Sequence, residues 1–433
     1  MQSTLSSLYF CRRAFYIYRS TQFVTCFLVA TAFANIGLAE GKDWPQFLGP
    51  DRNGISTETG LLEQWPAAGP KEIWRVPGGI GMSGFAINDD VLITMVQIGK
   101  SQFVLALAPA SGKEMWKTEV APAYGNTMGN GPRGTPAISG DRVFVYTGQG
   151  ILAALELSSG KLIWAANAVK DLGGKPAEYG MACSPLVVGD NVIVTVGAPK
   201  ATVVAFNAKT GKVEWSAGNE TTGYSSPVLL DVGGKEQVVA FTGSAAIGID
   251  PATGKLLWRY GYITDYKCNI ATPIQHDGKI LISSGENHGC ALLALKPNGD
   301  VFDVEEVWTS FGPKSVLRSE WQTAVLLDGY LYGLDNVGSA GPVTHLTCVN
   351  ATTGERAWQQ LRFGKSNLIS ADGKLFLSTM KGELVVAKAS PSGYEELGRK
   401  LYVGKTRQAP AICNGLLYLR DDREIVCIDV RKP

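Results

Sequence analysis

A six-residue motif, in which a turn glycine comes four residues before a tryptophan, recurs along the 433-residue chain. "SGKEMW", "SGKLIW", "TGKVEW", "TGKLLW" and "TGERAW" end at Trp116, Trp164, Trp215, Trp258 and Trp358. Together with Trp74 and Trp308, these tryptophans lie 42 to 51 residues apart. A repeat of that length indicates a solenoid or a propeller, because each unit is one supersecondary element that must stack on its neighbours.

Each repeat reads as four short strands. A segment of the type "TPAI" comes first, an alternating run such as "VFVYTG" follows, and "LAALEL" and "KLIW" complete the unit. Alternation of apolar and polar residues over four to eight positions, bounded by Gly, Asp and Asn, is typical of β-strands. We name these strands a, b, c and d. The Gly-Lys turn joins c to d, where glycine tolerates positive φ.

The two ends of the chain complement each other. "KEIWRV" around Trp74 is a strand d with no a, b or c before it, and the last repeat has a, b and c but no d. A closed ring in which the N-terminal strand completes the final blade satisfies both ends and removes open sheet edges. The sequence therefore predicts an all-β, eight-bladed propeller over residues 71–433, preceded by a lead-in segment over 40–70.

The repeat columns predict which side chains are structural. The tryptophans are expected to pack between blades as large apolar plates. Aligning the turn glycines places Leu397 in the tryptophan position of the seventh blade, and it places Ala294 and Ala387 in the column of small residues upstream of each turn. The structural tryptophans are Trp74, Trp116, Trp164, Trp215, Trp258, Trp308 and Trp358.

The run "ALELSSGKLIW", residues 154–164, resembles the tryptophan-docking repeat of pyrroloquinoline-quinone-type propellers, and "DWPQFLGPDRNG" and "GPRGTPAI" resemble segments of exported, uncharacterised members. The likeness runs from about Trp44 to the end. This family includes quinoprotein alcohol dehydrogenases and the non-enzymatic scaffold lipoprotein of the outer-membrane protein assembly machine. The resemblance is specific for fold and weak for function.

The first 39 residues differ from the rest. Three arginines precede the apolar run "FVTCFLVATAFA", and small residues follow it, which is the pattern of a secretory signal peptide. The alternative is an uncleaved anchor, since residues 21–39 are barely long enough to span a bilayer. We expect an exported chain, periplasmic or extracellular, with no membrane span in its mature part. A net charge of +1 gives no reason to expect nucleic acid as a partner.

Six cysteines lie beyond this segment. Cys348 and Cys427 occupy the column of small residues, which predicts buried free thiols that act as small hydrophobes. No two cysteines are adjacent and no Cys-x-x-Cys motif occurs, so the pattern indicates neither zinc nor redox chemistry.

The loops before each strand a are expected to ring the upper mouth of the central channel. Arg133, Arg318 and Arg407 should then face the channel from different blades, with Glu178 and Glu320 as internal acids that neutralise them in part. Arginine suits carboxylates, so the mouth is predicted to bind a small anionic ligand or a protein. The candidate binding residues are Asn130, Arg133, Glu178, Tyr179, Tyr224, Asn269, Arg318, Glu320, Trp321, Asn367 and Arg407.

Three functions remain open on the sequence. The first is a non-catalytic binding or scaffold module without a cofactor or a metal. The second is a quinone-dependent dehydrogenase, for which the resemblance implies pyrroloquinoline quinone, calcium and a catalytic Asp. Asp265 is the lone candidate for that Asp, and the adjacent cysteine pair of many members is missing. The third is a carbohydrate-active propeller, for which no acid–base pair can be nominated, so no catalytic residue is assigned.

Overall fold

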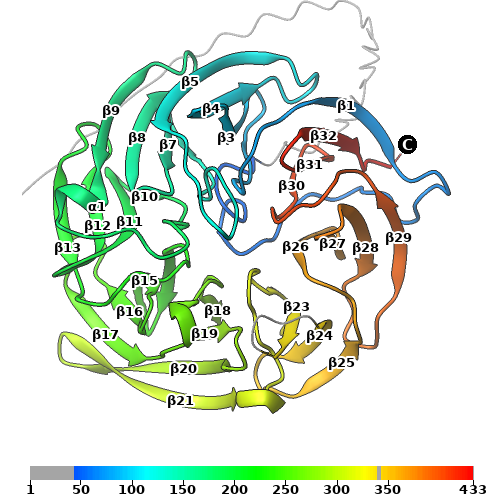
Figure 1. Cartoon of the computed structure of the whole chain (residues 1–433). Helices are drawn as coiled ribbons and strands as arrows, with labels where there is room; N and C mark the ends of the chain where they lie inside the picture. The colour runs from blue at the N-terminus through cyan, green and yellow to red at the C-terminus, as the bar shows by residue number, and fades with distance from the viewer. Residues whose placement is uncertain (1–42, 339–342, 433) are drawn as a thin grey trace, which may run out of the picture. The chain divides into compact units, whose positions relative to one another are not determined.

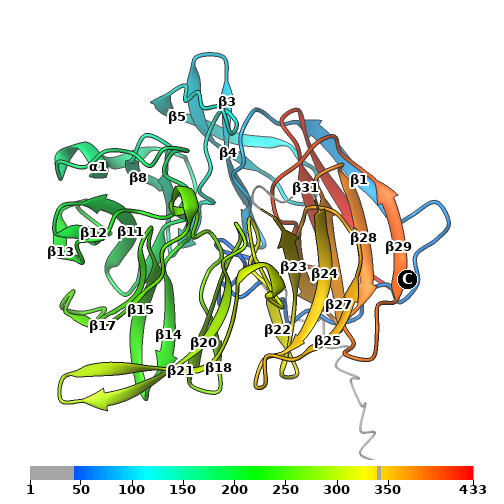
Figure 2. The same cartoon turned by 60° about the horizontal axis from the view of Figure 1, so that its bottom comes forward.

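The computed structural model describes residues 43–338 and 343–432. These residues form eight four-stranded antiparallel sheets arranged in a ring (Figures 1 and 2). The predicted signal peptide lies outside the described residues. Among the residues that are described, no helix has the length and apolar character needed to cross a membrane.

The innermost strand of each blade is strand a, and strands b, c and d follow it outwards (Figure 1). Strands a are β2 (Ala86–Ile87), β6 (Ala137–Ser139), β10 (Leu186–Val188), β14 (Val228–Val232), β18 (Ile274–His276), β22 (Val325–Leu327), β26 (Ser366–Ala371) and β30 (Ala411–Cys413). Strands b are β3 (Leu92–Ile98), β7 (Arg142–Tyr146), β11 (Asn191–Ala198), β15 (Lys235–Phe241), β19 (Lys279–Ser284), β23 (Tyr330–Val337), β27 (Lys374–Thr379) and β31 (Leu416–Arg420).

The outer half of each blade comprises strands c and d. Strands c are β4 (Ser101–Leu107), β8 (Ile151–Glu156), β12 (Ala201–Asn207), β16 (Ala245–Ile249), β20 (Gly289–Asn298), β24 (Val343–Asn350), β28 (Glu383–Lys388) and β32 (Glu424–Asp429). Strands d are β5 (Glu114–Pro122), β9 (Leu162–Asn167), β13 (Val213–Ala217), β17 (Leu256–Gly261), β21 (Val301–Phe311), β25 (Arg356–Gln360), β29 (Glu396–Leu401) and β1 (Lys71–Pro77). Three short helices complete the described elements: α1 (Ala168–Asp171), η1 (Asp265–Lys267) and η2 (Gly312–Lys314).

The predicted ring closure is confirmed. Strand β1 pairs with β32 in the last blade, with Trp74 opposite Cys427, and the sheet order is β1-β32-β31-β30. The first strand of the propeller therefore supplies the missing outer strand of the eighth blade, and the ring leaves no blade incomplete.

The tryptophan of one blade packs on the turn glycine of the next. A Cβ atom at Gly112 would lie 2.8 Å from the ring of Trp74, and one at Gly160 would lie 2.3 Å from the ring of Trp116. Only glycine leaves room for this contact, and these turns also have positive φ. The indole nitrogens donate to backbone carbonyls of the same turns; the six pairs are Trp74–Pro109, Trp116–Leu157, Trp164–Ala208, Trp215–Pro251, Trp308–Ala351 and Trp358–Ser390.

Blade 5 departs from this arrangement. Its c–d connection is the long hairpin β20–β21, so Trp258 of blade 4 finds no turn there and donates to Gln237 within its own blade at 2.7 Å. The prediction that Ala294 occupies the small-residue column is wrong, because the longer hairpin places Leu292 opposite Trp308 and Ala294 opposite Glu305.

Blade 7 also corrects a prediction. Gly398, and not Leu397, occupies the tryptophan position, because the c–d connection is longer and Val386 pairs with Gly398 while Ala387 pairs with Glu396. The prediction that Ala387 occupies the small-residue column is therefore also wrong, since Val386 stands there. The ring of Trp65, from the lead-in segment, lies against Gly398, where a Cβ would be 2.8 Å away. A tryptophan from outside the repeat thus packs where the repeat has none.

Candidate functional site

The central channel holds a cavity of about 590 Å³. Its wall includes residues from the loops before strands a, from the starts of those strands, and from the lead-in segment. We call these three levels the mouth, the waist and the floor. Each level has a different chemistry.

The lead-in segment forms the floor. Trp44 exchanges backbone hydrogen bonds with Ile87 at 2.9 and 2.8 Å, and Pro45 accepts from the backbone N–H of Ile138 at 2.8 Å. Further along, Ser370 exchanges backbone hydrogen bonds with Gly54 and Ser56. These contacts reach the ends of strands a, whereas the mouth loops precede the starts of strands a. The segment therefore covers the lower end of the channel, and it lies near the middle of the ring in the darkest blue of Figure 1.

Arg52 fixes the segment to blade 3. Its side chain is buried, and it donates to the carbonyl oxygens of Ser184 at 2.9 Å and Pro185 at 2.8 Å and to Gln46 at 2.9 Å. Burial lowers the pKa of Arg52 to about 10. Sequence analysis identified this segment only by its family likeness. The signal that was available is the Gly- and Pro-rich "FLGPDRNG", which is typical of a tight, irregular loop.

The waist is a belt of hydroxyl groups. The hydroxyl of a Ser or Thr just before a strand a accepts a hydrogen bond from a backbone N–H of the neighbouring blade. Three of these acceptors precede proline, and the fourth, Thr323, precedes Ala324. The four links, at 2.9 to 3.1 Å, are Gly84 to Thr135, Thr135 to Ser184, Ser184 to Ser226, and Thr272 to Thr323. The repeated Ser/Thr-Pro of the sequence is therefore a connection between blades, a role that its spacing alone did not reveal.

Arg133 lies at the mouth and is held rigidly. Its guanidinium donates to the carbonyl oxygens of Tyr179 (2.6 Å), Gly131 (2.6 Å) and Gly129 (2.8 Å), and it lies 4.7 Å from the ring centre of Tyr124. Burial lowers the pKa of Arg133, and the nearby positive charge of Arg407 lowers it further. Three backbone dipoles thus orient this cation.

The two other cations of the mouth, Arg407 and Lys365, lie over the ring of Trp321. The guanidinium carbon of Arg407 lies 5.0 Å from its ring centre, and the ammonium of Lys365 lies 4.1 Å from it. Arg407 also donates to the carbonyl oxygen of Met128. Contacts of this kind attract a cation to the face of an aromatic ring.

Two acids, Glu286 and Glu320, line the cavity, and Glu320 pairs with a lysine. Glu320 is buried and lies 2.8 Å from the ammonium of Lys365, and it accepts a further hydrogen bond from Asn336. Burial raises the pKa of Glu320. Within residues 43–338 and 343–432, neither Arg133 nor Arg407 makes an ion pair, so no carboxylate in direct contact offsets the charge of either guanidinium.

Seven of the predicted binding residues line the channel: Arg133, Tyr179, Tyr224, Glu320, Trp321, Asn367 and Arg407. Tyr179 and Tyr224 stack with ring centres 5.7 Å apart, and Asn367 donates to the carbonyl oxygen of Arg407 at 2.8 Å. Sequence analysis missed Met82 and Met128 of the same wall.

The other four predicted residues lie elsewhere. Asn130 and Glu178 are exposed, and Asn130 borders a smaller side cavity of about 230 Å³. Asn269 is buried and donates to the carbonyl oxygens of Thr242 and Tyr262, so it holds loops together.

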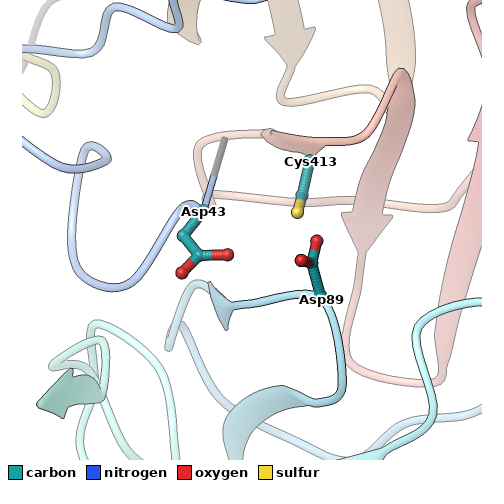
Figure 3. Close-up of side chains that lie close together, drawn as sticks. All are labelled: Asp43, Asp89 and Cys413. Carbon is teal, nitrogen blue, oxygen red and sulfur yellow. The ribbon is translucent and has the colours of Figure 1, made fainter. Parts of the chain in front are cut away.

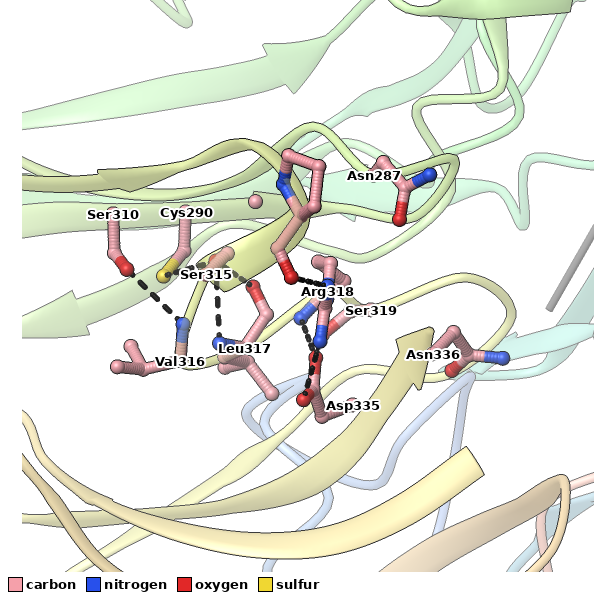
Figure 4. A network of polar contacts seen from close by, with 12 residues as sticks. Asn287, Cys290, Ser310, Ser315, Val316, Leu317, Arg318, Ser319, Asp335 and Asn336 are labelled. Carbon is pink, nitrogen blue, oxygen red and sulfur yellow. Dashed lines mark hydrogen bonds and ion pairs between the residues drawn. The ribbon is translucent and has the colours of Figure 1, made fainter. Parts of the chain in front are cut away.

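The prediction that Arg318 faces the channel is wrong. Its guanidinium forms a two-point ion pair with Asp335, at 2.7 and 2.8 Å, and donates to the carbonyl oxygen of Pro313 (Figure 4). Asp335 is fully buried and also accepts from Gln359 at 3.1 Å. The carboxylate lies seventeen residues along the chain in β23, so the loop sequence alone gave no sign of it.

Asp43, Asp89 and Cys413 gather at the outer end of the lead-in (Figure 3). Burial raises the pKa of the Cys413 thiol to about 12, so it stays protonated at neutral pH, and Asp89 accepts a hydrogen bond from Asn414.

The chain matches the family model described as "Outer membrane protein assembly factor BamB" over residues 100–335, more than half of its length. It belongs to this PQQ-type propeller family. BamB of Yersinia pestis is 23% identical over 348 residues, which cover 79% of this chain and 82% of that protein. Quinohemoprotein alcohol dehydrogenase ADH IIB of Pseudomonas putida is 33% identical over 156 residues, but these span only 33% of this chain and 21% of the enzyme.

Solved structures show the same fold. The quinohemoprotein alcohol dehydrogenase of Comamonas testosteroni superposes with a TM-score of 0.65 at 14% identity, covering 90% of this chain and 81% of that one. BamB of Moraxella catarrhalis gives 0.55 at 16% identity, covering 82% and 97%. Identities this low establish the fold alone.

The channel residues do not fit calcium and a quinone. Both carboxylate oxygens of Glu320 are already engaged, by Lys365 and Asn336, and the lysine ammonium would repel a cation placed there. Asp265, the lone candidate for a catalytic acid, is exposed in η1 and is not part of the channel wall. The described wall holds the cations Arg133, Lys365 and Arg407 and the acids Glu286 and Glu320, so cations outnumber acids where calcium would need oxygen ligands.

Proposed function

We propose that this protein is an exported, non-catalytic propeller that serves as a binding or scaffold module. Its upper channel mouth would hold an anionic group of a protein partner or of a small ligand. The family membership supports the scaffold part, since the matching family is described as an assembly factor. The leader-like N-terminal sequence supports export to the periplasm or the exterior.

The proposal of an anion site rests on one observation, the positions of two arginines at the mouth. Arg133 and Arg407 line the same cavity and donate to the same loop, Arg133 to the carbonyl oxygens of Gly129 and Gly131 and Arg407 to that of Met128. Neither makes an ion pair with an acid among the described residues. Of the two acids expected to neutralise them, Glu320 pairs with Lys365 and Glu178 is exposed. Two guanidinium groups that share one opening attract an anion and suit a carboxylate or phosphate in two-point geometry.

The test uses a fluorescent hexaglutamate peptide as the anionic probe and the chain from residue 40 onward. Arg407→Gln should weaken binding about tenfold or more, as expected for one lost charge-assisted bond, and salt should weaken binding to the unchanged protein. Arg431→Gln is the matched control, because Arg431 is exposed and pairs with Asp429. Equal affinity for the Arg407→Gln variant and the unchanged protein would contradict the site.

A further inference from the structure

The channel is closed at its lower end, which limits what can bind. Trp44 and Leu48 of the lead-in are buried and line the cavity. Backbone hydrogen bonds tie this segment to strands a of several blades, and Arg52 adds two more bonds to blade 3. A ligand must therefore enter and leave through the mouth, so a chain cannot thread through the ring.

The upper part of the cavity offers donors for an anionic head. Besides the guanidinium groups of Arg133 and Arg407, the hydroxyl groups of Thr135, Ser184 and Ser226 line the wall. Each of these hydroxyls accepts from a backbone N–H, and within the described chain none donates to a protein acceptor. A buried hydroxyl that has an unused proton favours a ligand that brings an acceptor.

The floor of the cavity is apolar. Trp44, Phe47, Leu48 and Phe85 lie there, with Leu368 in the adjoining wall. Leu48 adopts φ of 59°, a left-handed conformation that a bulky residue rarely takes. The surrounding hydrogen bonds hold this strained residue against the channel, and strain of this kind is typical of ligand-binding sites.

The distance between waist and floor is short. Thr135 belongs to the waist, and Ile138, three residues later, donates to Pro45 of the lead-in at 2.8 Å. Three residues of extended chain span about 10 Å. The apolar space below the donors therefore accommodates a short tail and excludes a long one.

We propose that the channel binds a small amphipathic carboxylate, with its head among Arg133, Arg407 and the waist hydroxyls and its tail on the floor made by the lead-in. This inference rests on the anion site proposed above and adds the apolar half of the ligand. The lead-in is then part of the binding site as well as of the fold.

The experiment measures the affinities of the chain from residue 40 onward for butanoate, hexanoate, octanoate and dodecanoate by calorimetry. Each methylene should strengthen binding about threefold to fourfold while it enters the apolar floor. The gain should stop once the tail reaches the lead-in, so dodecanoate should bind no better than octanoate. 1-Octanol, which has the same tail without the charge, should bind at least tenfold more weakly than octanoate.

Two variants separate the halves of the site. Leu48→Asn should weaken octanoate about tenfold and leave butanoate almost unchanged, and asparagine tolerates the left-handed backbone, so folding should survive. Ile98→Asn, at an exposed position of β3, is the matched control. Arg407→Gln should weaken all the carboxylates by a similar factor.

The outcomes distinguish this inference from the proposed function. Affinity that does not depend on chain length overturns the amphipathic ligand, and the anion site still stands if Arg407→Gln weakens hexaglutamate. If 1-octanol binds as tightly as octanoate, the proposal that a carboxylate head binds among the arginines and hydroxyls is wrong. If Arg407→Gln changes neither hexaglutamate nor octanoate, both proposals fail.

Discussion

The indole nitrogen of Trp74 donates to the carbonyl oxygen of Pro109 at 2.8 Å, and its ring lies where a Cβ at Gly112 would have to be. Trp74 belongs to β1, the strand that completes the last blade, and Pro109 lies in the first blade. This contact therefore joins the two ends of the ring.

Trp74→Ala should destabilise the protein by about 3–5 kcal/mol, because it leaves a cavity at the closure and removes the hydrogen bond. Denaturation in urea measures the change. Ile73→Ala, next to it on the same strand but 36% exposed, is the control and should cost within about 0.5 kcal/mol. Similar losses for the two variants would show that the closure does not depend on this packing.

The Arg318–Asp335 pair gives a second prediction. Asp335 is fully buried and faces Arg318 at 2.7 Å and Arg356 at 3.5 Å. Asp335→Ala leaves a buried guanidinium without its carboxylate and should cost about 3–5 kcal/mol.

The matched control for this pair is Asp300→Ala, which breaks an exposed ion pair with Lys255 and should cost less than about 1 kcal/mol. The test compares the free energies of unfolding of the two variants with that of the unchanged protein. A small effect of Asp335→Ala would mean that water or a backbone carbonyl can replace the carboxylate.

The ring could be predicted from the sequence because the residues that indicate it recur at a regular spacing. The turn glycine, the tryptophan and the unmatched "KEIWRV" each fix a strand, so the eight blades and their closure followed from the spacing. In the seventh blade the c–d turn before Gly398 is longer than in most of the other repeats. The distance from the turn glycine to the tryptophan position therefore differs, and counting from the glycine predicts the wrong residue.

The candidate site was predictable only in part. Position before a strand a placed Arg133 and Arg407 correctly at the channel, but the same rule failed for Arg318, whose partner Asp335 lies in another strand. The floor could not be predicted either, since the lead-in is held in place by contacts such as those of Arg52 with Ser184 and Pro185, more than a hundred residues away. Non-local partners of this kind leave no local pattern.

The described cysteines should be free thiols that react slowly. Cys183, Cys268, Cys290, Cys348, Cys413 and Cys427 form no disulfide in the structure. Burial raises the pKa of Cys348 to about 11 and that of Cys427 to about 12, so little thiolate exists at pH 8.

A thiol reagent added to the chain from residue 40 onward should therefore react slowly with the native protein at pH 8 and faster as the pH rises. After unfolding without reductant, all six thiols should react at once. A count of four, or a mass that shows a bridge to Cys348 or Cys427, would contradict this prediction.

The last prediction concerns the pH dependence of one turn. Asp250 accepts from the backbone N–H groups of Ala252 and Thr253 and lies 2.7 Å from the ammonium of Lys235. The hydrogen bond from Lys235 lowers the pKa of Asp250 to about 2. Because the folded pKa lies below the unfolded value, near 4, the stabilisation is complete above about pH 4 and is lost as the pH falls toward 2.

Asp250→Asn keeps the turn and removes the charge, since Asn207 and Asn350 accept the same backbone hydrogen bonds in other blades. The variant should therefore be less stable than the unchanged protein at pH 6, and the difference should shrink between pH 4 and pH 2. Urea denaturation across this range measures it. A difference that stays constant with pH would mean that the charge of Asp250 contributes nothing to the turn, and that its hydrogen bonds alone stabilise it.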